Sequence, residues 1–531
     1  TAYEITYGDW SSDVCSSDLA IARIETKTSS ELTDLQKEWL NNFINNYNEK
    51  TKESKAYTQL HRKKLADPRV VTGFKPILKE VTYQVIVDGS KGAHLFDLDG
   101  NQYIDILSGF GSNMFGHSAP FVTAAIEEQL RSGYEVGPQH PMAAEVAELI
   151  CEFTGFDRAA LCNTGSEAVL GCIRMARTVT NRSLIIMFAG SYHGIIDEVI
   201  ARSTKRHKTF PAAAGIMPES VQNILVLDYG TEESLEIIRK RAGEIAAVLV
   251  EPIQSRRAEF KPVEFLKEVR KITESSGSVL IFDEVITGFR LAPGGAQEYF
   301  GIRADVAAYG KVCGGGMPIG VMAGKQEYMD ALDGGFWQFG DDSVPEVGVT
   351  YFAGTFVRHP FALAAAKASL LFMKEQGPQL QQSLNARTQK MVDELNDFCR
   401  TKNVPFSFVS FASLFKIKYE FEYQFSELLF LLLRYKGIHV YDGFPCFLTI
   451  AHDESDINKI IAAHKEAITE LMDAGFIPVK ENTAKENSAN IYSVEVASPP
   501  VEGARLGKDI NGNPAWFVPD PDRPGKYLMV E

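Results

Sequence analysis

Tyr309-Gly310-Lys311-Val312-Cys313-Gly314-Gly315-Gly316 is the stretch of sequence that decides the fold. The mostly apolar segment from Ala304 to Ala308 leads directly into it, which indicates a buried strand that ends at Lys311. An ammonium group is costly to desolvate, so a lysine in this place is either a solvated turn residue or a functional one. Burial lowers the pKa of a lysine, and its neutral amine can form a Schiff base with an aldehyde.

A second apolar run ends upstream in two acidic residues, Ser278-Val279-Leu280-Ile281-Phe282-Asp283-Glu284-Val285. The run is typical of a strand buried on both faces, with Asp283 at its C-terminal end, where open α/β sheets bind ligands. An acidic strand end that faces water is one interpretation. The other is a carboxylate that keeps a pyridinium nitrogen protonated, as pyridoxal phosphate (PLP) requires when it withdraws electrons from a substrate carbon.

A third motif has the features of a phosphate site. The short apolar strand from Ala159 to Cys162 is followed by the turn Asn163-Thr164-Gly165-Ser166-Glu167 and then by a helical composition. The start of a helix offers free backbone N–H groups and a positive dipole end, and Ser166 adds a hydroxyl. An ordinary serine cap of the helix is the alternative.

Three further motifs resemble ligand-binding loops. Gly190-Ser191-Tyr192-His193-Gly194 follows an apolar strand, and its aromatic ring could lie flat on a cofactor. Glu251-Pro252-Ile253-Gln254 also follows an apolar strand, and Phe352-Ala353-Gly354-Thr355-Phe356 is a loop of small residues with one hydroxyl. Each motif is a common loop when it is taken alone.

In this order, the motifs NTGSEA, SYHG, EPIQ, FDEVITGFR, GKVCGGG and GTF make the chain resemble the class III aminotransferases, which are fold-type I PLP enzymes. The resemblance covers roughly Phe74 to Pro478. It implies an α/β fold with a large domain, in which helices wrap a mostly parallel sheet, and a smaller α+β domain built from N- and C-terminal segments. The alternation of apolar strands and helical segments between about 118 and 365 independently favours a parallel sheet.

The resemblance also implies roles for matching residues. Lys311 would bind the PLP aldehyde and, once an amino donor displaces it, move a proton between the substrate carbon and the cofactor. The other cofactor contacts would be Asp283 at the pyridine nitrogen, Val285 and Tyr192 on opposite ring faces, Gly165 and Ser166 at the phosphate, and Gln254 near the phenolic oxygen. Thr355 would reach the phosphate of a neighbouring subunit, because members of the family build each site across a homodimer.

Some residues of these motifs have less defined roles. His193 and Glu251 are further cofactor-binding candidates, and they either orient other groups or hold the loops, as Glu167 could. The glycine-rich loop Gly109-Phe110-Gly111-Ser112-Asn113-Met114-Phe115-Gly116-His117 is either a structural turn or, by resemblance, the lining of the acceptor pocket. Ser112 and Asn113 are its substrate candidates, and Arg290 is either a clamp for a substrate carboxylate or structural.

Composition agrees with a soluble enzyme. The chain has 531 residues, a net charge of −15 and a pI near 5.3, which argues against a nucleic-acid partner. It shows neither an apolar run of the ~20 residues that span a membrane nor a signal-peptide pattern, and its seven cysteines have no metal-ligand or disulfide spacing. We therefore expect free thiols, no metal and a cytoplasmic location. The segment Asp97 to Asn101 is similar to a calcium loop but lacks the required glycine and final acid, so a hairpin is favoured.

The sequence predicts five regions. Residues 1–20 lack periodicity and repeat Ser-Ser-Asp, which indicates a non-native leader or a mobile tail. The polar helical segments that follow are either docking or linker helices or solvated ones. The predicted regions are 1–66 (leader and linker or docking helices), 67–117 (first part of the small domain), 118–365 (large PLP-binding domain), 366–478 (second part of the small domain) and 479–531 (linker to a following module).

The C-terminal segments point to a substrate. Gly503 to Lys508 and Pro514 to Pro519 resemble segments that follow aminotransferase domains in polyketide–nonribosomal peptide assembly lines. In that family the acceptor is a β-keto acyl thioester on an acyl carrier protein, and glutamine or glutamate is the expected donor. The alternatives are a free-standing enzyme of the glutamate-1-semialdehyde aminomutase type, another class III aminotransferase, and a non-catalytic scaffold. The intact set of Lys311, Asp283 and Gly165-Ser166 argues against the scaffold.

Overall fold

The computed structural model describes residues 32–70, 74–420 and 425–478 and three strands within 505–530. The chain forms two units, Thr1–Val479 and Lys480–Glu531. The leader expected at 1–20 and the polar segment after Val479 lie outside the described residues. The finer domain boundaries within the first unit stay predictions.

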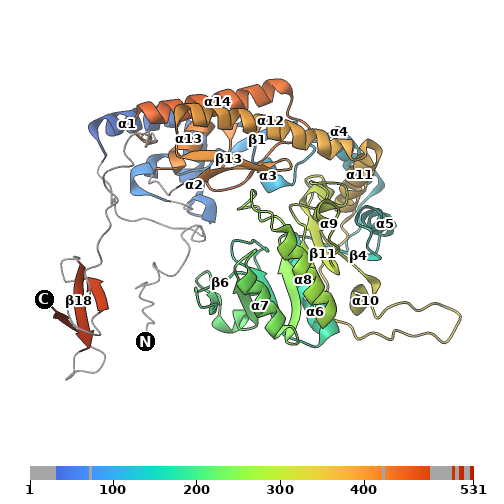
Figure 1. Cartoon of the computed structure of the whole chain (residues 1–531). Coiled ribbons are helices and arrows are strands. Elements are labelled where there is room, and N and C mark those ends of the chain that lie inside the picture. The colour runs from blue at the N-terminus through green and yellow to red at the C-terminus, as the bar shows by residue number, and fades with distance from the viewer. Residues whose placement is uncertain are drawn as a thin grey trace. The chain divides into compact units, whose positions relative to one another are not determined.

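A seven-stranded sheet forms the centre of the large domain, as the alternating pattern predicted (Figure 1). Every neighbouring pair is parallel except those of β12, which runs antiparallel to both β4 and β11. In spatial order the strands are β4 (Arg158–Cys162), β12 (Gly320–Gly324), β11 (Val306–Gly310), β10 (Val279–Asp283), β9 (Ile245–Val250), β5 (Leu184–Phe188) and β8 (Ile224–Leu227).

Two apolar cores cover the two faces of this sheet. Side chains alternate along a strand, so Leu280 and Phe282 of β10 enter one core while Val279 and Ile281 enter the other. Burial on both faces explains why the central strands are continuous apolar runs. The helices of this region are α4 (Pro120–Ser132), α5 (Met142–Thr154), α6 (Gly165–Thr180), α7 (Glu232–Arg241), α8 (Val263–Ser276), α9 (Gly295–Phe300), α10 (Gln326–Met329) and α11 (Pro360–Gln376).

Local sequence explains where these helices begin and end. Thr164 caps α6 by accepting a hydrogen bond from the Glu167 amide. α8 buries an apolar stripe and ends at Gly277, whose φ of +68° suits a left-handed helix terminus. The smaller elements are β6 (Ala201–Ser203), β7 (Thr209–Pro211), and the 3₁₀ turns η4 (Asp197–Val199), η5 (Pro218–Val221), η6 (Lys311–Gly314) and η7 (Asp330–Leu332).

The small domain combines segments from both ends of the first unit. Its first sheet is β1 (Val87–Lys91), β2 (His94–Asp97), β3 (Gln102–Asp105) and β15 (Ile438–His439), and its second is β13 (Phe406–Phe411), β14 (Leu414–Tyr419) and β16 (Cys446–Phe447). Ile104 of β3 pairs in parallel with Ile438 of β15, which joins the N- and C-terminal segments. This arrangement confirms the fold that the resemblance implied.

Helices complete the small domain. α1 is mostly polar, yet it buries Leu40, Phe43 and Tyr47, and Trp39 packs edge-on against Phe476 with ring centroids 5.3 Å apart. It therefore belongs to the core that the C-terminal segments also build. The helices and 3₁₀ turns are α1 (Asp34–Lys50), α2 (Lys52–His61), α3 (Ser108–Gly111), α12 (Gln379–Lys402), α13 (Glu427–Tyr435), α14 (Glu454–Asp473), η2 (Pro68–Val70) and η3 (Pro76–Val81).

The second unit contains a three-stranded antiparallel sheet of β17 (Arg505–Lys508), β18 (Pro514–Pro519) and β19 (Tyr527–Val530). The segments that suggested a module linker are thus partly strands. Within the described ranges, no helix combines the length and the apolar character needed to cross a bilayer.

Candidate active site

Lys311 stands directly after β11, at the C-terminal edge of the large sheet. Its φ of +44° lies in the left-handed region, which a non-glycine residue rarely adopts, and such strain is found preferentially at functional sites. Burial lowers the pKa of the Lys311 amine to about 8, the charges of Asp283 and Glu251 oppose this shift, and the charge of Arg290 adds to it. The amine is therefore more readily neutral than an ordinary lysine, as the sequence predicted.

Asp283 ends β10, the strand next to β11, and the register pairs it with Ala308. Its side chain is 5% exposed. One carboxylate oxygen lies 2.7 Å from Nδ1 of the buried His193, and the other accepts a hydrogen bond from the Val285 amide. His193 thus holds the carboxylate, while its own Nε2 has no partner among the described residues.

Glu251 and Gln254 organise the adjoining loops after β9 and β5. Glu251 is buried and accepts hydrogen bonds from the Tyr192 and Ser255 amides. Burial, together with the Asp283 charge, raises the pKa of the Glu251 carboxyl, and His193 opposes this. The Gln254 amide nitrogen donates to the Ala189 carbonyl and the Ser191 hydroxyl, and its buried oxygen has no partner within the described residues.

The start of α6 lies against Val285. A Cβ added at Gly165 would lie only 2.8 Å from each Val285 methyl group, so a glycine is needed there. The Ser166 hydroxyl accepts a hydrogen bond from the Ile195 amide. Glu167 accepts hydrogen bonds from the Asn163 amide and side chain, which identifies it as a residue that holds the loop.

Arg290 is committed to other protein groups. Its guanidinium is buried, donates to the Ser413 hydroxyl at 2.7 Å and to the Gly111 carbonyl at 2.5 Å, and stacks 4.9 Å from the Phe447 ring centroid. Burial lowers its pKa to about 9. Of the two interpretations that the sequence left open, these contacts favour a structural role.

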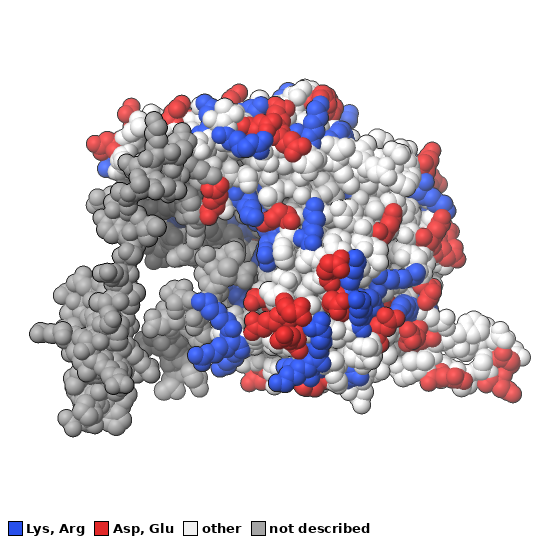
Figure 2. Space-filling view, in the orientation of Figure 1, with Lys and Arg blue, Asp and Glu red and all other residues white. Residues whose placement is uncertain are grey.

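The segment between η7 and α11 projects from the molecule and carries Thr355, which is exposed (Figure 1). Large apolar side chains line the segment without being covered, with Phe339 92%, Tyr351 79% and Phe336 78% exposed. Figure 2 shows the projection as mostly uncharged atoms with a few acidic side chains. Within the described residues no hydrogen bond joins Thr355 to the Lys311 cluster, so its predicted role depends on a second subunit.

Sequence motifs alone missed several residues around this edge. Arg256, from the loop after β9, is a half-buried cation near Tyr192, and Lys416 of β14 is a half-buried cation near Arg256. Asp105, which precedes the glycine-rich loop of Ser112 and Asn113, pairs with His117 at the end of that loop. A buried strand that ends in an acid is a signal for Asp105, but its distant partners become visible only in the fold.

The assembled residues fit PLP. An amine with a lowered pKa, a carboxylate fixed by a histidine, and a helix start with a hydroxyl meet at one sheet edge. The buried unpartnered atoms, His193 Nε2 and Gln254 Oε1, are the kind of groups that a polar ligand satisfies. Fold and site together define a fold-type I PLP-dependent transferase.

Comparison with known proteins narrows this class. The family described as aminotransferase class-III matches residues 78–440, and the chain belongs to this family. It is 34% identical over 396 residues to the glutamate-1-semialdehyde 2,1-aminomutase of Archaeoglobus fulgidus, covering 71% of this chain and 91% of that protein. It is 35% identical over 419 residues to the enzyme of the same name from Methanocaldococcus jannaschii, covering 74% and 92%.

Solved structures agree with this family. A transaminase with PLP bound superposes with a TM-score of 0.72 and 25% identity, over 80% of this chain and 99% of that one. A β-phenylalanine aminotransferase from Variovorax paradoxus gives a TM-score of 0.70 and 25% identity, over 84% and 100%. The predicted cofactor, PLP, and the predicted class of enzyme are thereby confirmed.

Proposed function

We propose that this class III aminotransferase aminates a β-keto acyl thioester carried by an acyl carrier protein, with glutamine or glutamate as the amino donor. The contacts of Arg290 are the observation that favours this acceptor. A free keto acid needs a cation beside the predicted acceptor loop for its carboxylate, whereas a thioester has no carboxylate to bind. The arginine that the sequence offered for this purpose is instead bound to Gly111 and Ser413.

Lys311 and Asp283 are the proposed catalytic residues. Bound PLP supplies an aldehyde that condenses with amines and a ring that withdraws electrons from the substrate carbon. Asp283 provides a negative charge for the ring nitrogen, and His193 keeps that carboxylate in place at 2.7 Å. With its pKa lowered to about 8, the Lys311 amine can accept the proton that leaves the substrate carbon. It can then donate this proton on the cofactor side of the amine transfer.

Other residues of the cluster would bind and orient the cofactor. Val285 and Tyr192 would cover the two ring faces, as the resemblance implied. Gly165 and Ser166 would bind the phosphate at the start of the 16-residue helix α6. Gln254 would reach the phenolic oxygen, and Glu251 would hold the Tyr192 loop through its backbone amide.

A cationic pair supports a donor with a carboxylate. Burial lowers the pKa of Lys416 and the charge of Arg256 lowers it further, while Asp442 and Glu259 oppose the shift. Burial raises the pKa of the Tyr192 hydroxyl, and the charge of Arg256 opposes this rise. Neither cation forms an ion pair within the part of the chain that the structure describes, so both can attract the carboxylate of glutamate or glutamine.

The exposed projection supports a homodimer with shared sites. Its apolar side chains would be covered by a second subunit, and the same segment would deliver Thr355 to that subunit's phosphate site. Monomeric proteins rarely expose so continuous an apolar surface.

Intact-mass analysis tests the substrate. A carrier protein loaded with a β-keto acyl group is incubated with the enzyme and either glutamine or glutamate. Conversion of the keto group to an amine changes the mass of the loaded carrier, and Lys311→Ala is the control that should show no change. An enzyme that aminates free keto acids but leaves the loaded carrier unchanged would contradict the proposed acceptor.

The second candidate is an aminomutase of the glutamate-1-semialdehyde type. It is favoured by the names of the curated relatives, of which the chain covers 91–92% in the two cases given above. The reaction moves an amine within one small molecule and needs no external donor. Formation of aminolevulinate from glutamate-1-semialdehyde by the purified chain, without transfer to a loaded carrier, would establish this candidate over the first.

A further inference from the structure

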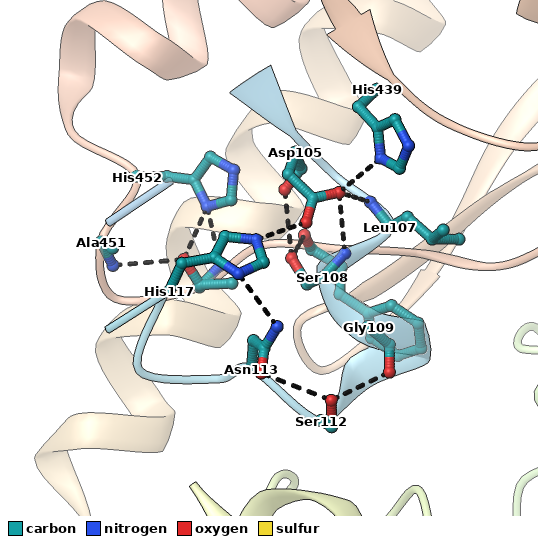
Figure 3. A network of polar contacts seen from close by, with 12 residues as sticks. Asp105, Leu107, Ser108, Gly109, Ser112, Asn113, His117, His439, Ala451 and His452 are labelled. Atoms are coloured by element: carbon teal, nitrogen blue, oxygen red, sulfur yellow. Dashed lines mark hydrogen bonds and ion pairs between the residues drawn. The ribbon is translucent and has the colours of Figure 1, made fainter. Parts of the chain in front are cut away.

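A buried carboxylate holds together the base of the predicted acceptor loop (Figure 3). Asp105 ends β3 and is 3% exposed. Its carboxylate accepts hydrogen bonds from the Leu107 and Ser108 amides, lies 3.0 Å from Nδ1 of His439, and lies 2.7 Å from Nε2 of His117. Burial raises the pKa of Asp105, but the hydrogen bonds from the two histidines outweigh it and hold the pKa below the usual range.

The partners of His117 determine which of its nitrogens carries the proton. A carboxylate only accepts, so Nε2 of His117 must donate to Asp105. On the other side of the ring, Nδ1 lies 3.3 Å from the amide nitrogen of Asn113, which only donates. With the Asn113 nitrogen turned toward it, Nδ1 of His117 is the acceptor of this contact.

The same contact places the two ends of the Asn113 amide. Its nitrogen is engaged by His117, so its oxygen faces Ser112 and Gly316. A Cβ added at Gly316 would lie 3.0 Å from this oxygen, and Gly316 itself is exposed in the glycine cluster that follows Lys311. The carboxylate, the histidine and the amide thus form a chain from the small-domain core to the lysine loop.

The backbone between these groups is strained. Ser108 and Phe110 have φ values of +49° and +57°, which non-glycine residues rarely adopt. The two backbone amides bound by Asp105 lie at the start of this strained turn. At the other end of the turn, the Arg290 guanidinium donates a hydrogen bond to the Gly111 carbonyl. The loop is therefore held in one conformation from both ends, as expected for a substrate-binding element.

We infer that Asp105 and His117 are positioning residues, which make Asn113 present a hydrogen-bond acceptor, its carbonyl oxygen, to the substrate. An acceptor binds an N–H or O–H group and repels a carboxylate. This disfavours a free acid on the loop side and favours an acyl group whose arm carries N–H groups, as a carrier-bound thioester does. The inference rests on the proposed function and adds to it the residue that discriminates between the two kinds of acceptor.

A double-mutant cycle tests the inference. His117→Phe removes the lone pair that holds the Asn113 nitrogen, and Asn113→Leu removes the amide. Each should raise KM for the loaded carrier about tenfold, which is the loss of one hydrogen bond, with kcat little changed. The double variant should be no worse than Asn113→Leu alone, because both changes remove one interaction. Multiplying effects, or an unchanged KM in either single variant, would overturn the inference.

A conservative variant separates positioning from folding. In His117→Gln the side-chain amide can donate to Asp105 and accept from Asn113, so KM should return to within about threefold of the wild-type value. Equal KM values for His117→Gln and His117→Phe would contradict the role of the lone pair. His94→Gln is a matched control, since His94 lies 3.0 Å from Asp456 in another histidine–aspartate pair. It should leave KM unchanged.

The same variants also test the positioning role if the proposed function is wrong. If the wild-type chain does not aminate a loaded carrier, the same variants are measured on glutamate-1-semialdehyde. A coupled effect on KM there would keep the positioning role of Asp105 and His117 and refute the carrier-bound acceptor. Independent effects, or none, would refute the positioning role. The absorption of enzyme-bound PLP, which reports on the Lys311 side, should be the same in all variants.

Discussion

Replacing Gly165 with alanine should push Val285 away from the start of α6. The added Cβ would lie 2.8 Å from both Val285 methyl groups, about 1 Å closer than the usual carbon–carbon contact. Such overpacking costs about 1–3 kcal/mol, and the better helix propensity of alanine returns at most about 1 kcal/mol. We expect a net loss of about 1–2 kcal/mol in the free energy of unfolding.

The same displacement should weaken PLP binding, because Val285 would move into the space of the cofactor ring. Each 1.4 kcal/mol corresponds to a tenfold change in the dissociation constant, so a loss of about tenfold is expected. Urea unfolding measures the stability, and titration with PLP followed by absorbance measures the affinity. Gly243→Ala is the matched control, since a Cβ there has no neighbour within 4 Å and should change neither quantity.

A third variant decides whether the clash is the cause. In Gly165→Ala/Val285→Ala the interfering methyl groups are gone, so stability should recover toward that of Val285→Ala alone. The reasoning is refuted if Gly165→Ala is as stable as the wild-type chain, or if removing the Val285 methyl groups brings no recovery.

Three further results are expected. Incorporation of PLP into the cofactor-free chain should accelerate as pH rises through about 8, because burial lowers the pKa of Lys311 to that value and only the neutral amine reacts. Stopped-flow absorbance measures this rate, and a midpoint of its pH dependence above about 10 would contradict the prediction. Burial raises the pKa of Glu284 from 4.5 to about 7, so its contribution to stability is full below about 4.5 and is lost as pH rises through about 7. Glu284→Gln should remove this loss in urea unfolding at pH 5 and 8, and an unchanged difference would argue against it. Phe339→Ser with Tyr351→Ser should raise the dimer dissociation constant at least about hundredfold, at about 1.5–3 kcal/mol for each buried aromatic side chain. Light scattering measures this constant, and Leu98→Ser is the control outside the projection.

Local sequence was sufficient to locate four central strands of the large domain. The apolar runs that predicted strands are β5, β9, β10 and β11, and each ends at the polar motif expected of it. This works because a strand buried on both faces has no polar positions, so its end is visible as the first charged or polar residue.

Long-range pairing was beyond local reasoning. His193 was expected near the cofactor, but its bond to Asp283, 90 residues away, follows only from the neighbouring positions of the strands. His439 meets Asp105 over a separation of 334 residues, and it lies on a strand of two residues that no periodicity reveals. The antiparallel course of β12 was equally hidden, because an apolar run carries no sign of direction.

The parallel pairing of β3 with β15 has a consequence for the way the chain is made. A ribosome releases Ile104 long before Ile438, so the first small-domain strands wait for their partner while the whole central sheet emerges. The two apolar cores of the sheet can pack during synthesis. The loop beside Asp105 lacks one of its hydrogen-bond partners until His439 has been synthesised. The acceptor loop therefore completes its contacts only after residue 439 has been synthesised.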